Sequence, residues 1–231
     1  MKLLSRIKNH SASIVILSVA MIAFIAASLW LSSTTGAWRM LQVDRILAGG
    51  DQVDPEILHQ ILAQGNPDKA VSAGASLHSH SLVAAALYAE SKEESEAARK
   101  VLIEGKISAQ TALSLEPADA YAWARLAYFR HELDGPSPRV LNALRMSVYT
   151  APSDSDLIFW RLGMTAGSHT YWDDASMDWI YRQILTGWSI NRKMLVQTAE
   201  AYGFLSLVRM VLASDPEAST RLERIISSSN Q

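Results

Sequence analysis

Apolar residues follow two different patterns along this chain. Residues 13–31 form an apolar run with no polar face, and no charged residue occurs between Lys8 and Arg39. As a helix rising ~1.5 Å per residue, this run would span about 28 Å, close to the ~30 Å hydrocarbon core of a bilayer. From residue 54 onward, apolar residues recur every three or four positions between short polar turns. That second pattern is typical of helices that bury one face.

The apolar run predicts a single transmembrane helix. Cations precede it and indole rings follow it, so the N-terminus is expected in the cytoplasm and the rest of the chain across an inner membrane. The residues expected at the membrane interfaces are Lys2, Arg6, Lys8, Trp30 and Trp38. The alternative is a signal peptide cleaved after Ala37, although the run exceeds the ~7–15 apolar residues of a signal-peptide core.

Helix start signals are frequent after the apolar run. Asp54-Pro55, Ser137-Pro138 and Asp215-Pro216 each pair an N-cap residue with a proline at the first helical position. Residues 91–94 fit a capping box that begins a longer helix, and Ser153 with Asp156 forms another capping pattern. Strand signals are almost absent. The chain is therefore expected to be all-α, a transmembrane helix followed by a stack of α-hairpins.

Two single residues refine this expectation. Gly105 would cost its helix about 1 kcal/mol relative to alanine, so we expect a neighbouring helix to approach closely there. Asn191 is expected to cap a helix that carries Leu195, Thr198 and Tyr202. The expected organisation is a cytoplasmic N-terminus (1–12), a transmembrane helix (13–31), a linker with a short amphipathic helix (32–53) and a periplasmic helical domain (54–231).

One stretch repeats its pattern. Trp123 precedes Leu126-Ala127 by three residues, Phe159 precedes Leu162-Gly163 in the same way, and Pro117 and Pro152 are 35 residues apart. The spacing is close to the ~34-residue period of tetratricopeptide repeats. Residues 90–165 resemble a degenerate pair of such repeats.

That resemblance implies a concave surface, lined by the first helix of each repeat, that holds a peptide or a partner helix. The residues it would place in this groove are Tyr121, Ala124, Tyr128, His131, Leu157, Trp160 and Met164. Aromatic residues at helical spacing are also common in cores, so packing between hairpins is the alternative interpretation.

Composition excludes several functions. The chain has no cysteine, which excludes disulfides, thiolate metal sites and a cysteine nucleophile. It has 21 basic and 23 acidic residues, and without Lys2, Arg6 and Lys8 the remainder holds 18 basic residues. This balance argues against nucleic-acid binding, which depends on clustered cations.

No convincing catalytic set is present, and no cofactor, metal or small-molecule substrate is expected. The densest polar cluster is His169–Asp174, interpreted as a loop with an exposed histidine and an N-cap aspartate. The chain is therefore expected to be an envelope scaffold that binds protein partners, in polysaccharide or secretion machinery. The alternative is an exported enzyme that acts on envelope glycans through Asp173, Asp174 or Glu132.

Overall fold

The computed structural model describes residues 81–88 and 95–229 of the 231-residue chain. These residues belong to one compact unit, Val53–Gln231. The expected transmembrane helix and its five interface residues lie outside the described residues. Within the described ranges, no helix combines the length and apolarity that crossing a bilayer requires.

Every regular element in the described residues is helical, which confirms the all-α expectation for this part of the chain. A helical segment covers residues 81–88. It is followed by α4 (Glu96–Leu115), α5 (Ala120–Asp134), α6 (Pro138–Thr150), α7 (Ser155–Ala166), the 3-10 turn η2 (His169–Tyr171), α8 (Asp174–Ile190), α9 (Arg192–Ala201), α10 (Leu205–Leu212) and α11 (Pro216–Ser229).

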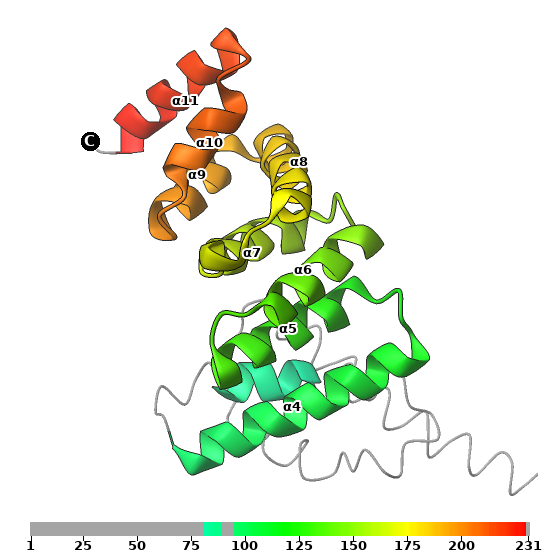
Figure 1. Ribbon diagram of the computed structural model, residues 1–231. Coiled ribbons are helices and arrows are strands. Elements are labelled where there is room, and N and C mark those ends of the chain that lie inside the picture. Colours follow the sequence, from blue (N-terminus) through cyan, green and yellow to red (C-terminus); the bar gives the residue numbers. More distant parts are fainter. Residues whose placement is uncertain (1–80, 89–94, 230–231) are drawn as a thin grey trace, which may run out of the picture. The chain divides into compact units, whose positions relative to one another are not determined.

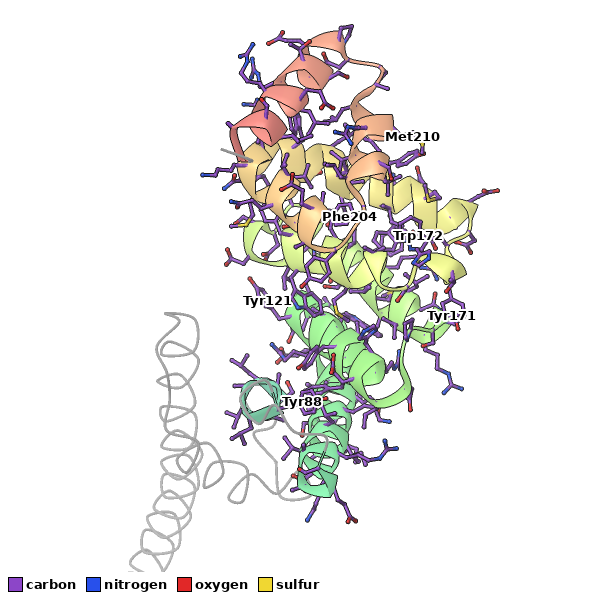
Figure 2. All side chains as sticks on the ribbon, turned by 90° about the vertical axis from the view of Figure 1, so that its left-hand side faces the viewer. Tyr88, Tyr121, Tyr171, Trp172, Phe204 and Met210 are labelled. Carbon is purple, nitrogen blue, oxygen red and sulfur yellow. The ribbon has the colours of Figure 1, made fainter. Side chains whose placement is uncertain are left out.

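The helices stack in chain order. α4 packs on α5, α5 packs on α6, and α7 contacts both α8 and α9 (Figure 1). Side chains fill the space between successive helices (Figure 2). The largest core cluster runs from Ala127 of α5 to Leu222 of α11, and Leu144, Ile184 and Leu195 within it are fully buried.

Two matching turns precede α5 and α7. Pro117 and Pro152 each begin a turn, and two residues later an aspartate, Asp119 or Asp154, caps the next helix. The two helices begin at Ala120 and Ser155, 35 residues apart. A proline that ends one helix, followed by an acceptor side chain that caps the next, sets this local geometry.

The helix starts at Ser137, Asn191 and Asp215 are confirmed, while two other predicted starts are wrong. The helix expected from residue 91 begins at Glu96, because Ser95 accepts a hydrogen bond from the Ala98 amide (3.1 Å). Ser95 lies three residues before the Ala98 amide, which is the spacing at which an N-cap side chain accepts a hydrogen bond from the first turn of its helix.

The cap of α7 and the end of α9 also differ from the prediction. Asp154 caps α7 in place of Ser153, since its carboxylate accepts from both the Asp156 and Leu157 amides (3.0 and 3.2 Å). α9 ends at Ala201, one residue before the expected Tyr202. Gly203 has φ of 73°, a conformation that favours glycine and turns the chain into α10, which the sequence did not predict.

The close approach expected at Gly105 is confirmed. A Cβ added there would lie 2.5 Å from Cζ of Phe129 on α5 and 2.9 Å from Cβ of Ala84. Gly105 thus lets α4 pack against both α5 and the segment 81–88. This contact positions one wall of the groove described next.

Candidate functional site

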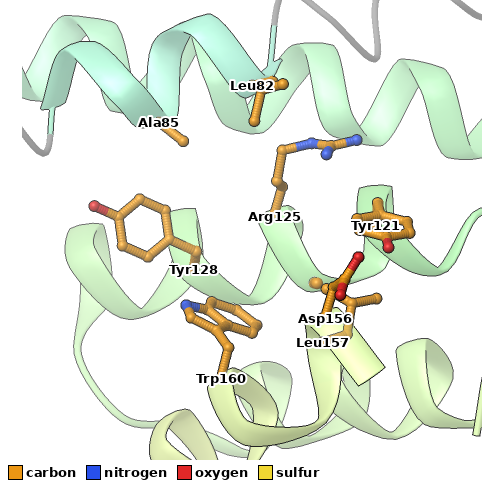
Figure 3. Close-up of a pocket in the computed structure, with 9 residues that line it drawn as sticks. Leu82, Ala85, Tyr121, Arg125, Tyr128, Asp156, Leu157 and Trp160 are labelled. Carbon is orange, nitrogen blue, oxygen red and sulfur yellow. The ribbon is translucent and has the colours of Figure 1, made fainter. Parts of the chain in front are cut away.

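A cavity of about 430 Å³ opens between the segment 81–88, α5 and α7 (Figure 3). We call it the aromatic groove. Its lining residues are Leu82, Ala85, Tyr121, Ala124, Arg125, Tyr128, Asp156, Leu157 and Trp160. On each helix these residues are one, three or four positions apart, so each helix contributes one face. α4 and α6, which alternate with these three helices along the chain, contribute no lining residue.

Five of the seven residues named from sequence line this groove: Tyr121, Ala124, Tyr128, Leu157 and Trp160. The other two, His131 and Met164, lie about a turn further along α5 and α7. His131 faces Gly167, where an added Cβ would be 3.6 Å from its Cε1. Met164 is half-buried against the main core cluster.

Sequence reasoning missed four lining residues, namely Leu82, Ala85, Arg125 and Asp156. Arg125 directly follows Ala124, and Asp156 directly precedes Leu157. The sequence reasoning had named both Ala124 and Leu157. A wider arc on each helix would have included Arg125 and Asp156. The segment 81–88 lies outside the residues that resemble the repeat, so only its packing reveals its contribution.

Tyr121 closes one end of the groove. Its hydroxyl donates a hydrogen bond to Asp154 Oδ1 at 3.3 Å. Partial burial, the hydrogen bond to Asp154 and the negative charge of Asp154 and Asp156 together raise the pKa of Tyr121 to about 12. Its hydroxyl therefore stays protonated at neutral pH and remains a donor.

Tyr128 on α5 and Trp160 on α7 contribute two further rings to the lining of the groove (Figure 3). Tyr128 also packs edge-on against Tyr88, with ring centroids 6.3 Å apart. Burial, reinforced by the nearby Glu132 carboxylate, raises the pKa of the Tyr128 hydroxyl well above its usual value. The groove thus offers neutral aromatic surface.

Arg125 joins two walls of the groove. Its side chain is only 8% exposed, and its Nε donates to Ser81 Oγ at 2.7 Å. This bond ties α5 to the segment 81–88. Most of the guanidinium is therefore engaged within the protein and not presented to solvent.

Arg161 joins the other elements beneath the groove. It is fully buried, and it donates from Nε to Ser147 Oγ (3.0 Å), from Nη1 to Ala151 O (2.8 Å) and from Nη2 to Ser147 O (2.8 Å). Ser147 Oγ in turn donates to Ala120 O at 2.6 Å. Burial lowers the pKa of Arg161 to about 10, so it remains a cation at neutral pH. It thereby satisfies carbonyls at the negative end of α6 and links α5, α6 and α7.

A second cavity of about 380 Å³ lies between the end of α6 and α8. Tyr149 and Leu185 line it, and Tyr149 is 64% exposed. Gln183 lies at its base and donates to Pro152 O at 2.8 Å, which holds the turn before α7. Its aromatic lining residues are Tyr149 and the buried Trp179, whereas the aromatic groove has three, Tyr121, Tyr128 and Trp160.

The residues considered for catalysis do not converge. Asp173 caps α8, accepting from the Ser176 amide (2.8 Å) and hydroxyl (2.5 Å), and the hydroxyl bond lowers the pKa of Asp173. An ionised capping carboxylate is a poor general acid. Glu132 lines a different hollow, between α4 and α5. Among the described residues, no group of three His, Asp or Glu side chains is placed to hold a metal.

Comparison with known proteins adds no template for this chain. No protein-family model, curated protein or solved structure matches it. Its function is therefore inferred from the geometry of the groove and from the sequence.

Proposed function

We propose that this protein is a membrane-anchored adaptor that binds protein partners through the aromatic groove. The observation that carries the proposal is the convergence of one face from each of three helices on a single open, mainly apolar cavity. Three of its lining residues are Tyr121, Tyr128 and Trp160, the residue types that dominate binding energy in protein interfaces.

The walls of the groove are held in place before any partner binds. Arg125 fixes the segment 81–88 to α5, and Arg161 fixes α7 to the ends of α6 and α5. A preorganised surface loses little conformational entropy on binding. This rigidity suits a binding module, in which an apolar segment of the partner lies along the helices.

The resemblance to tetratricopeptide repeats supports the same proposal. In that family the first helix of each hairpin lines the concave surface. Here the lining residues come only from alternate helices, and α5 and α7 begin 35 residues apart. This arrangement is the one that a degenerate repeat array would produce.

The proposed location follows from the sequence. Residues 13–31 would anchor the protein in an inner membrane with the N-terminus in the cytoplasm and the helical domain in the periplasm. Confinement to the membrane raises the effective concentration of the groove for partners in the envelope.

Topology can be tested directly because the chain contains no cysteine. We expect Ser228→Cys, at an exposed position of α11, to react with a membrane-impermeant maleimide in intact spheroplasts. Ser5→Cys should react only after the membrane is permeabilised. The reverse labelling pattern would refute the proposed orientation.

Partner binding can be tested by site-specific photocrosslinking in native membranes. A photoreactive residue at Trp160 should give a discrete adduct, and the same residue at Tyr149, an exposed tyrosine outside the groove, serves as the control. The adduct at Trp160 should disappear when Tyr121 and Tyr128 are replaced by alanine. Circular dichroism should show that these variants remain folded. Identical adducts at Trp160 and Tyr149, or an adduct unaffected by the alanine variants, would refute the proposal.

A further inference from the structure

Charges are unevenly distributed around the aromatic groove. Two cations on the helices that form the groove, Arg125 and Arg161, are 8% and 0% exposed and donate hydrogen bonds within the protein. The carboxylate of Asp156 also lines the groove, but it is exposed at the start of α7. The cations therefore lie at the base, and a negative charge lies at the mouth.

Asp156 differs from the carboxylate beside it. Asp154 already caps α7, accepts from the Tyr121 hydroxyl and lies close enough to Arg161 to interact with its charge. Asp156 accepts only a long hydrogen bond from the Ser155 hydroxyl, at 3.4 Å. Among the described residues, the ion pairs are Arg182–Asp178, Arg209–Glu223 and Arg221–Glu217, so Asp156 has no ionic partner in this part of the chain.

A second carboxylate lies near the groove tyrosines without lining the groove. Glu132 lies one turn beyond Tyr128 on α5, is half-buried, and acts on Tyr128 through its negative charge. Glu132 itself lines the neighbouring hollow between α4 and α5, so Asp156 is the carboxylate that lines the groove. An anionic segment that passes Asp156 would be repelled there.

Building on the proposed function, we propose that the groove binds a protein segment that pairs an apolar side chain with an adjacent lysine or arginine. The apolar side chain packs against Trp160 and Leu157, and the cation pairs with Asp156 at the mouth. The exposed faces of the groove tyrosines add cation–π attraction to the same charge. The occupant is thus a basic amphipathic peptide of a partner protein.

The expected contribution of charge is modest. An exposed ion pair changes affinity by about two- to fivefold, and the effect decreases as salt rises above physiological strength. Charge at this site therefore selects among apolar segments, while the aromatic surface supplies most of the affinity.

The test is selection from a random peptide display library against the full-length protein in detergent, compared with four variants. Trp160→Ala tests the groove, and Asp156→Asn and Asp156→Lys test the charge. The matched control is Asp174→Lys, because Asp174 is also an exposed acid in the first turn of a helix but lies outside the groove. Thermal melts of all variants verify folding.

We expect wild-type selections to be enriched in peptides with lysine or arginine beside an apolar residue. Asp156→Asn should weaken the binding of these peptides by about two- to fivefold. Asp156→Lys should shift the enrichment to peptides with glutamate or aspartate beside the apolar residue. Asp174→Lys should leave the wild-type pattern intact, and Trp160→Ala should abolish it.

Three results would overturn this inference, and they differ in what they say of the proposed function. Peptides that depend on Trp160 but show no basic preference would overturn the inference and leave the groove as a protein-binding site. Absence of any Trp160-dependent peptide would overturn both. Concentration-dependent self-association lost in Trp160→Ala, without peptide selection, would identify a second copy as the occupant and also overturn the inference.

Discussion

Replacing Gly105 by alanine tests the packing that positions the groove. The added Cβ would lie 2.5 and 2.6 Å from Cζ and Cε1 of Phe129, and 2.9 Å from Cβ of Ala84. Phe129 and Ala84 are both fully buried, so neither can move into solvent to relieve the contact. α4 must therefore shift away from α5 and from the segment 81–88, which forms one wall of the groove.

Two effects of opposite sign decide the magnitude. Alanine favours the helix over glycine by about 1 kcal/mol. Overpacking a buried contact costs about 1–3 kcal/mol. Because two separate buried groups lie below 3.0 Å, the cost belongs at the upper end of that range. We expect Gly105→Ala to lower the free energy of unfolding by about 1–2 kcal/mol, which lowers the melting temperature by roughly 2–8 °C.

The assay is thermal unfolding followed by circular dichroism at a helical wavelength, on the full-length protein in detergent. Gly167→Ala is the control, because a Cβ there would meet His131 Cε1 and Met164 O at an ordinary 3.6 Å. Gly167 has φ of −61°, which alanine adopts without strain. Its melting temperature should stay unchanged or rise slightly. A Gly105→Ala protein as stable as wild type would show that the three helices do not pack as closely as described.

Three further substitutions probe the polar groups around the groove. Arg161→Met should destabilise the fold by about 2–4 kcal/mol in urea unfolding, since it removes three hydrogen bonds and leaves Ala151 O at the end of α6 without its side-chain donor; an unchanged midpoint would refute the role of Arg161. Tyr121→Phe should remove a tyrosine that ionises near pH 12 from the absorbance titration at 295 nm. Because the folded-state pKa of Tyr121 is raised, its contribution to stability is complete below about pH 10 and is lost as pH rises toward 12; a wild-type titration identical to that of the variant would contradict this. Asp173→Ala should lower the stability of the fold at neutral pH through loss of the cap on α8. Since the folded-state pKa of Asp173 is lowered, the difference between wild type and variant should vanish as pH falls through that pKa; a difference that persists in acid would contradict the assignment.

Local signals in the sequence were sufficient for most of the described helices and for one face of α5 and α7. Asn191 and Asp215 cap helices because an acceptor side chain reaches amides only two or three residues ahead. The helical period alone places Tyr121, Ala124 and Tyr128 on one face, and the groove uses that face. These properties depend on neighbouring residues, so they can be read without the fold.

Competing local signals were resolved only by the folded chain. Ser91 and Ser95 are both serines ahead of an acidic residue, and Ser153 and Asp154 are both acceptable caps. The structure selects Ser95 and Asp154, whose side chains accept from the first-turn amides of α4 and α7. Candidate caps that lie only one or four residues apart cannot be ranked by propensity alone.

The sequence by itself therefore determined that the described region is helical, where most helices begin, and which residues share a face. Tertiary structure alone decided that Leu82 and Ala85, from outside the repeat-like stretch, complete the groove. It also decided that Arg161 is buried against the end of α6 while Asp156 stays exposed at the mouth. The physical reason is range: helix period and capping act within about four residues, whereas burial and the pairing of charges depend on segments brought together from distant parts of the chain.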